Sequence, residues 1–259
     1  MCRFKSGIIL KTRCVIAQGS DDSHTRLLEE LKIEDSELNA MSKFVRAELI
    51  PPNGEWWTHP DTWEINIDQD ITPDWFNDDK TRYIEEFKQA VIAWWEKHVL
   101  IDKVIDELSS GYYRLKRCEV KRLCKDVRVM CDSSTVQVMC DSSTVQRMYS
   151  SSTVQDMYDS STVQVMCDSS TVQRMYGSST VQRMCDSSTV QDMCNSSTVQ
   201  VMCDSSTVQR MYSSSTVQRM YGGSTVQRMC NSSIARDYTN GILRVSSNTS
   251  LKVQKHVNK

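Results

Sequence analysis

The feature that most constrains this chain is a nine-residue repeat that fills its second half. Ser-Thr-Val-Gln occurs eleven times between Ser134 and Gln227, and each copy is followed by a variable residue and then by Met. Nine residues make about 2.5 turns of α-helix, so successive Val residues would point in opposite directions and no apolar stripe could form. The high Ser and Thr content also disfavours a helix. The repeat therefore predicts β-structure.

The spacing of the apolar residues predicts a strand that bends. A straight strand places residues three apart on opposite faces, yet Val136 and Met139 are the two apolar residues of each unit. A bend after Gln137 lets both point inward, with Ser134 also inward and Thr135 outward. Such units are typical of a parallel β-solenoid. The predicted solenoid core includes Val136, Met139, Val163, Met166, Val190 and Met193.

Two repeats, or eighteen residues, are predicted to form one coil, because one unit is too short to enclose a core. At this spacing the variable position would stack alternating charges on neighbouring strands, as an exposed ladder of Asp156, Arg174, Asp192 and Arg210. The position after Met exchanges Cys with Tyr and is predicted to face outward, with Cys167, Cys185 and Cys203 in one exposed ladder. Asp168, Asp186 and Asp204 would stack as like charges, and only solvent exposure would reduce their repulsion.

The repeat resembles the pentapeptide-repeat-like β-solenoids, which also place a small residue two positions before a central inward apolar residue. The resemblance covers about half of the chain, and it departs from that family in its period of nine instead of five. The nonapeptide calcium β-roll also has two units per coil. Its Gly-Gly-x-Gly-x-Asp motif is absent, so the resemblance implies no calcium ladder.

Residues 1–108 predict a small α+β domain ahead of the all-β parallel solenoid. Strands are expected between Gly7 and Gln18, at 44–50 and at 63–68. Asp21, Asp22 and Ser23 offer caps for a short helix with Leu27, Leu28 and Leu31 on one face. A long helix is predicted from Asp79 to Leu108. Residues 109–126 are interpreted as a junction with an imperfect first coil, and 127–259 as the nonapeptide-repeat solenoid. Arg244 and Ser247 replace core residues and predict a degenerate C-terminal cap.

Composition and charge exclude several classes of function. Residues 1–117 carry 16 Lys and Arg against 22 Asp and Glu, and the remainder carries 15 against 11, so nucleic-acid binding is not expected. No apolar run approaches about 18 residues, so no membrane span is expected. Seven of the eleven cysteines alternate with Tyr in one position of the repeat, which argues against a disulfide framework and favours a reduced, cytoplasmic protein.

All six tryptophans lie in the first 108 residues. One interpretation is that they are core and packing residues. The other is an aromatic-lined pocket or partner surface around Trp56, Trp57 and Trp75, which lie near predicted turns and are the candidate binding residues.

The sequence contains no P-loop, Gly-x-Gly-x-x-Gly, His-Glu-x-x-His, Gly-x-Ser-x-Gly or Cys-x-x-Cys motif, so it predicts no cofactor and no metal site. The candidate nucleophile is Cys2, which becomes N-terminal once Met1 is removed. Its Met-Cys opening resembles those of class II amidotransferases and of the abasic-site-binding family that links DNA through this cysteine. Both families have Gly where this chain has Arg3. If Cys2 were catalytic, His24 and Glu48 would be the expected supporting residues.

The N-terminal part also resembles an uncharacterised domain of gut-bacterial and phage proteins, through its opening Cys-Arg-Phe-Lys-Ser-Gly-Ile-Ile-Leu and the Phe-Val-Arg-Ala-Glu-Leu strand. This resemblance implies a bacterial or phage origin and no activity. The overall prediction is a non-catalytic β-solenoid scaffold or binding module with an unidentified protein partner, because near-identical repeats give near-identical surfaces. The alternative is an enzyme that uses the Cys2 thiol.

Overall fold

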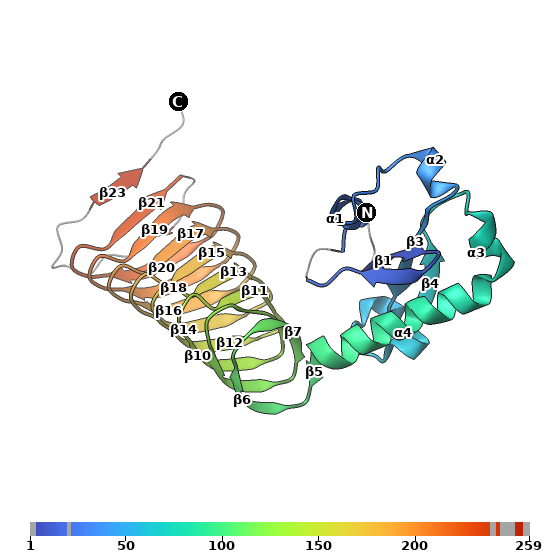
Figure 1. Ribbon diagram of the computed structural model, residues 1–259. Coiled ribbons are helices and arrows are strands. Elements are labelled where there is room, and N and C mark those ends of the chain that lie inside the picture. Colours follow the sequence, from blue (N-terminus) through green and yellow to red (C-terminus); the bar gives the residue numbers. More distant parts are fainter. Residues whose placement is uncertain (1–3, 20–21, 239–241, 244–251, 256–259) are drawn as a thin grey trace. The chain divides into compact units, whose positions relative to one another are not determined.

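The computed structural model describes residues 4–19, 22–238, 242–243 and 252–255 (Figure 1). The chain divides into two compact units, residues 1–99 and 100–259. The first unit is an antiparallel sheet with helices, and the second is a parallel β-solenoid with about 18 residues per turn. The predicted fold class is therefore confirmed.

The first unit is built on a four-stranded antiparallel sheet in the order β2-β1-β3-β4. These strands are β1 (Lys5–Leu10), β2 (Arg13–Ile16), β3 (Phe44–Ile50) and β4 (Glu64–Ile67). Strand β1 pairs with both β2 and β3, so its Ile8 and Ile9 lie in the middle of the sheet and are fully buried. The strand predicted at 44–50 has the predicted bounds.

Helices accompany this sheet, and none of those described is long and apolar enough to cross a membrane. Ser23 caps the first helix by accepting a hydrogen bond from the Arg26 N–H, as its position predicts. The longest helix buries one stripe of Tyr83, Phe87, Val91 and Trp94. The helices are α1 (His24–Leu31), α2 (Glu37–Ala40), α3 (Asp74–Asp78) and α4 (Lys80–His98), with 3-10 turns η1 (Pro52–Gly54) and η2 (Pro60–Thr62).

The long helix predicted to reach Leu108 ends ten residues earlier, at His98, so that part of the prediction is wrong. The chain continues as β5 (Val99–Ile101) and β6 (Val104–Leu108), with Asp102 between them at a φ of 53°. Ile105 and Leu108 pair with Val120 and Leu123 of the next coil. Ile105 and Leu108 lie four and seven residues after Ile101, a spacing that imitates a helical stripe, but their pairing in the solenoid makes this segment a strand.

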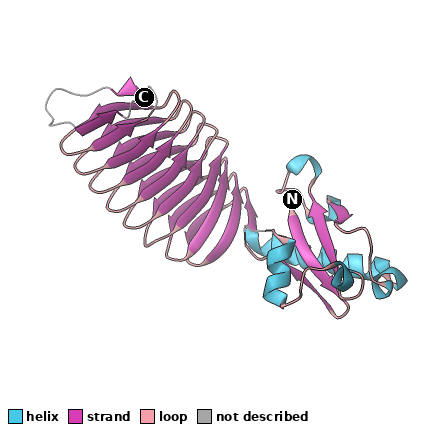
Figure 2. Cartoon of the chain, turned by 90° about the horizontal axis from the view of Figure 1, so that it is seen from above, coloured by secondary structure: helices cyan, strands magenta, loops and turns pink. Residues whose placement is uncertain are grey.

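The second unit consists of two parallel sheets whose strands alternate along the chain (Figure 2). The even sheet contains nine strands, β6 to β22, and the odd sheet contains ten, β5 to β23. Each five- to six-residue strand of the repeat starts at Thr. The strands after β6 are β7 (Gly111–Lys116), β8 (Glu119–Leu123), β9 (Val127–Asp132), β10 (Thr135–Met139), β11 (Thr144–Tyr149), β12 (Thr153–Met157), β13 (Thr162–Met166), β14 (Thr171–Met175), β15 (Thr180–Met184), β16 (Thr189–Met193), β17 (Thr198–Met202), β18 (Thr207–Met211), β19 (Thr216–Met220), β20 (Thr225–Met229), β21 (Ile234–Asp237), β22 (Ile242–Leu243) and β23 (Lys252–Lys255).

The strand register confirms the eighteen-residue coil. Val136 pairs with Val154 and Met139 with Met157, and the same offset holds in the odd sheet. Every Val that precedes Gln in the repeat, and every Met that follows, is at most 1 % exposed, whereas the Thr side chains are partly exposed. The six predicted core residues, Val136, Met139, Val163, Met166, Val190 and Met193, are all fully buried.

The solenoid begins earlier than predicted, because β5 to β8 already belong to its two sheets. Val120, placed in the predicted junction, pairs with Ile105 before it and with Val136 after it. These first coils are two or three residues shorter than the later ones. Their turns are shorter, but the apolar spacing of three residues is already present.

The turns between strands explain the polar residue after Cys or Tyr. In every complete repeat this residue has a positive φ, which Asp, Asn and Gly adopt most readily. The Ser two positions later donates its N–H to the preceding Cys or Tyr carbonyl, as from Ser206 to Cys203 at 3.2 Å. Asp168, Asp186 and Asp204 are exposed at these turns. Backbone conformation therefore accounts for the stacked aspartates.

The repeat register continues only in part at the end of the described residues, because Thr225 of β20 pairs with Ile242 of β22 at an offset of seventeen residues. Ile234 pairs with Lys252 and Ala235 with Val253, again eighteen residues apart. Ala235 occupies the Val position and is fully buried. Arg244 and Ser247, on which the prediction of a degenerate cap rests, lie outside the described residues.

Candidate functional site

Three polar side chains from separate elements of the first unit meet beside strand β3. His24 begins α1, Glu48 lies in β3 and Asp68 follows β4. One side-chain nitrogen or oxygen atom of each residue lies within 4.8 Å of the corresponding atoms of the other two. His24 is 5 % exposed and Glu48 is 2 % exposed, while the Asp68 side chain is 53 % exposed. This group is called the His24 cluster.

Hydrogen bonds fix the orientation of the His24 cluster. The His24 Nε2 atom lies 3.1 Å from the Ala47 carbonyl oxygen, so this nitrogen carries the proton and donates it. The Nδ1 atom then points to the Asp68 carboxylate, 3.3 Å away. Asn66 donates its side-chain N–H to Glu48 at 3.2 Å. The imidazole and the buried carboxylate are thus each held by a neighbour.

A second buried charge lies in the same unit on strand β1. Lys5 is fully buried, and its Nζ atom lies 2.9 Å from Asp22 and 3.8 Å from the centre of the Trp94 ring. A lysine is seldom fully buried unless it is paired. The ion pair and the aromatic face both stabilise its charge in this position.

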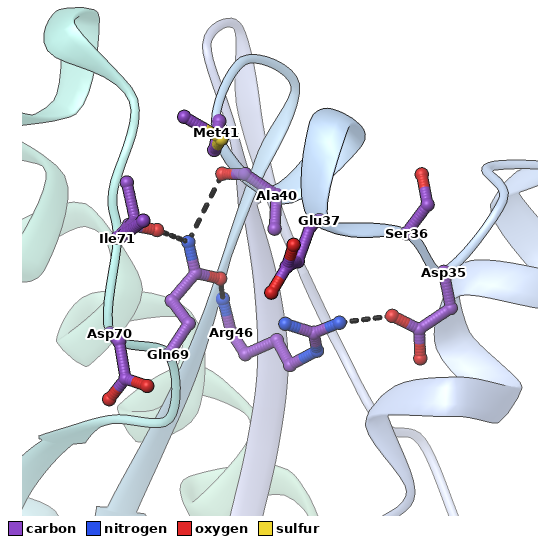
Figure 3. Close-up of a pocket in the computed structure, with 9 residues that line it drawn as sticks. All are labelled: Asp35, Ser36, Glu37, Ala40, Met41, Arg46, Gln69, Asp70 and Ile71. Atoms are coloured by element: carbon purple, nitrogen blue, oxygen red, sulfur yellow. Dashed lines mark hydrogen bonds and ion pairs between the residues drawn. The ribbon is translucent and has the colours of Figure 1, made fainter.

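A pocket of about 410 Å³ opens beside strand β3, with Arg46 in its lining (Figure 3). Arg46, two residues before Glu48 in this strand, lines the pocket and is ion-paired with Asp35. Gln69 follows Asp68 directly and donates to the carbonyls of Ala40 and Ile71. Because alternate residues of a strand share a face, the pocket and the His24 cluster are neighbours.

The pocket has an apolar rim. Met41 and Ile71, which line it, are 48 % and 55 % exposed. The acidic side chains of Asp35, Glu37 and Asp70 also line it, against the single cation of Arg46. A pocket with convergent titratable groups beside it is the usual form of a ligand site, so this region is the candidate site of the first unit.

The predicted aromatic surface is not formed as one site. Trp56 and Trp57 follow the end of β3 and contact each other edge to face, with ring centres 5.6 Å apart. Trp75 donates to the Ser42 carbonyl just before β3 and packs on Tyr83 at 5.0 Å. The two groups therefore lie at opposite ends of this strand. Trp63 and Trp94 are buried, in agreement with the packing interpretation.

Of the thiol-enzyme residues, the structure brings together His24 and Glu48 as members of the His24 cluster. Cys2 lies outside the described residues. Asp68 and the pocket are not predicted from the sequence, because the residues come from α2, β3 and the segment after β4. The one feature of the sequence that could have indicated this site is the presence of isolated polar residues within apolar strands, such as Glu48 in β3.

The charged ladder of the solenoid has the predicted pairing. Arg174 places Nε 2.6 Å and Nη2 2.7 Å from the two carboxylate oxygens of Asp156. Arg210 forms the same two-pronged ion pair, or fork, with Asp192 at the same distances. Asp156 was predicted to be exposed but is only 9 % exposed, because the guanidinium on the next strand covers it. Each fork links two neighbouring strands of the even sheet.

The Cys and Tyr positions form stacked columns, as predicted. Tyr158 and Tyr176 stack with ring centres 5.1 Å apart and an angle of 10° between planes. Cys167, Cys185 and Cys203 are free thiols and are half-buried, so they are less exposed than predicted. Burial, followed by the neighbouring thiols, raises the pKa of Cys185 to about 11.

This pKa predicts how the native thiol column reacts with iodoacetamide. Only the thiolate reacts, so the alkylation rate of Cys185 should rise about tenfold per pH unit from pH 8 to pH 10, whereas an ordinary thiol of pKa ~8.5 would level off. Peptide mapping by mass spectrometry after timed alkylation measures the rate. A plateau above pH 9 would contradict the raised pKa, and labelling of Cys185 only after denaturation would show that this column is closed to solvent.

Comparisons of the chain with protein-family models, with curated proteins and with solved structures find no match. The candidate sites therefore rest on the geometry of this chain.

Proposed function

We propose that the solenoid is a non-catalytic scaffold that binds a protein partner through its repeated surfaces. The observation that carries this proposal is the column of exposed Arg147, Arg183 and Arg219 in the odd sheet, with Val165 and Val201 on the strands between them. Neighbouring strands are about 4.8 Å apart, so these cations repeat about every 9.6 Å. A partner with acidic side chains at that interval would gain the same contact at each repeat.

The test compares two charge reversals in the full chain. Arg183→Glu with Arg219→Glu changes the odd sheet, and Arg228→Glu changes one exposed arginine of the even sheet. Proteins recovered by affinity purification from the native host should be lost with the double variant and kept with the control. Retention of the same proteins by the double variant would contradict binding through the odd sheet.

A second candidate is a thiol enzyme with Cys2 as its nucleophile. The observation in favour is that His24 and Glu48 are close to each other and that Cys2 lies only three residues before β1, which pairs with β3 opposite Glu48. An imidazole and a carboxylate near an N-terminal thiol could activate it and orient a substrate.

Thiol reactivity tests this candidate against an internal reference. Burial, followed by the Glu86 carboxylate, raises the pKa of Cys14 to about 11, so this half-buried thiol reacts slowly at pH 7. An activated Cys2 should be alkylated at least about 100-fold faster in the native chain. Equal rates at the two positions would rule out an activated nucleophile.

The proposal also covers the compartment, the origin and the repeat class of this protein. We infer a cytoplasmic protein of bacterial or phage origin, with a nonapeptide solenoid related in design to the pentapeptide-repeat-like proteins. Free thiols throughout the described repeat, where Cys and Tyr exchange, support a reducing compartment.

A further inference from the structure

We propose that His24, Glu48 and Asp68 form a binding site for one divalent transition-metal ion that accepts nitrogen and oxygen ligands. This inference goes beyond the proposed scaffold and does not depend on it. The three residues supply one imidazole and two carboxylates from three different elements. Imidazole and carboxylate together suit Mn²⁺, Fe²⁺ or Zn²⁺.

The ligand atoms are already gathered before any ion binds. All three lie within 4.8 Å of one another, and the His24 Nδ1 atom is 3.3 Å from the Asp68 carboxylate. Ligands bound to one ion at about 2.0 to 2.2 Å lie some 3 to 4 Å apart, so small rotations of the side chains would suffice. Two carboxylates held this close repel each other, and a cation between them would remove that repulsion.

The surrounding hydrogen bonds have the form expected around a metal site. Ligating histidines donate their second ring N–H to a carbonyl or carboxylate, and ligating carboxylates are held by a further donor. Here the His24 Nε2–H donates to the Ala47 carbonyl at 3.1 Å, and the Nδ1 atom faces the Asp68 carboxylate. Asn66 donates to Glu48 at 3.2 Å. Both buried ligands are therefore oriented.

The site also has an entrance. His24 and Glu48 are buried, but the Asp68 side chain is 53 % exposed and provides a path from solvent. The next residues, Gln69 and Asp70, line the pocket of Figure 3. Three protein ligands leave at least one coordination position open to water or to a small molecule, as in metal sites that bind substrates.

The sequence predicts no metal site because these three ligands have no short, recognisable spacing. His24, Glu48 and Asp68 are separated by twenty or more residues and have no motif in common. The pairing of β3 with β4, in which Glu48 lies opposite Asn66, brings the last two ligands together. The N-terminal cap of α1 then places His24 beside them.

The experiment titrates the full chain with Mn²⁺ and follows the loss of the free-ion signal by electron paramagnetic resonance. Mn²⁺ is chosen because the eleven thiols of the chain favour softer ions. The parent should bind one Mn²⁺. Asp68→Asn and Glu48→Gln should each raise the Kd for Mn²⁺ at least about tenfold. Asn66→Leu should raise it by a similar factor, because it removes the hydrogen bond that orients Glu48.

The matched control is His59→Ala. His59 and Asp61 form an exposed pair 3.0 Å apart without a third ligand, so this variant should bind Mn²⁺ as the parent does. Asp68 is half exposed, so its substitution should leave the fold intact, which tryptophan fluorescence checks. Absence of saturable binding in the parent, unchanged binding in Asp68→Asn and Glu48→Gln, or loss in His59→Ala would each overturn the proposal.

Discussion

Val190→Asp should destabilise the solenoid by more than about 3 kcal/mol. The Val190 side chain is fully buried in the solenoid core. Val190 pairs with Val172 and Val208 on the adjacent strands. The substitution buries a carboxylate in the core cluster of the solenoid, and such a charge costs several kcal/mol unless it is paired. Urea unfolding followed by far-ultraviolet circular dichroism measures the change.

The control for this prediction is Thr189→Asp, which places the same charge one residue earlier on a partly exposed side chain. Its expected cost is below about 1 kcal/mol, the range of strand preferences. Equal losses from the two variants would mean that the strand does not present Val inward and Thr outward. Tryptophan fluorescence should change in neither variant, because all six tryptophans precede residue 100.

Gly7→Ala should destabilise the first unit by about 2 to 3 kcal/mol and leave the solenoid unchanged. A Cβ atom at this position would lie 2.5 Å from the Phe87 ring of α4 and 2.7 Å from the Val15 carbonyl oxygen. The ring is fully buried and the carbonyl belongs to the neighbouring strand, so neither can move cheaply. Loss of tryptophan fluorescence on heating reports this unit alone.

Gly19→Ala is the matched variant, because no atom lies within 4 Å of its added Cβ. It should keep the melting temperature of the parent or raise it slightly, since alanine restricts the unfolded chain. A similar decrease in melting temperature in both variants would mean that the backbone, and not the contact with Phe87, causes the effect of Gly7→Ala. A parallel loss of the solenoid signal would show that the two units unfold together.

The repeat could be predicted in detail because local and long-range signals agree in it. Val136 and Met139 specify the inward positions, and the charges of Asp156 and Arg174 specify the strand offset, so the register follows from the sequence. The turn residues add a third signal, since Asp, Asn and Gly share a preference for positive φ.

The first coils and the polar site could not be predicted in the same way. Ile101 and Ile105 satisfy a helical spacing, and only pairing with Val120 reveals that Ile105 lies in a strand. The His24 cluster depends on where three elements meet, which depends on the whole sheet. Burial of Asp156 depends on the conformation of the arginine side chain above it.

The solenoid surface has a longer translational period than its backbone. The fold repeats with every eighteen residues, but Asp156 recurs as Asp192 and Arg147 recurs as Arg183, which are two coils apart. Between Arg147 and Arg219 the variable position of the repeat therefore recurs about every 9.6 Å, twice the strand spacing. Removing a single coil, such as the one with Val165, would bring Arg147 against Arg183, whereas removing two coils preserves the pattern. Changes in the length of this protein that conserve its surface should therefore occur in steps of thirty-six residues.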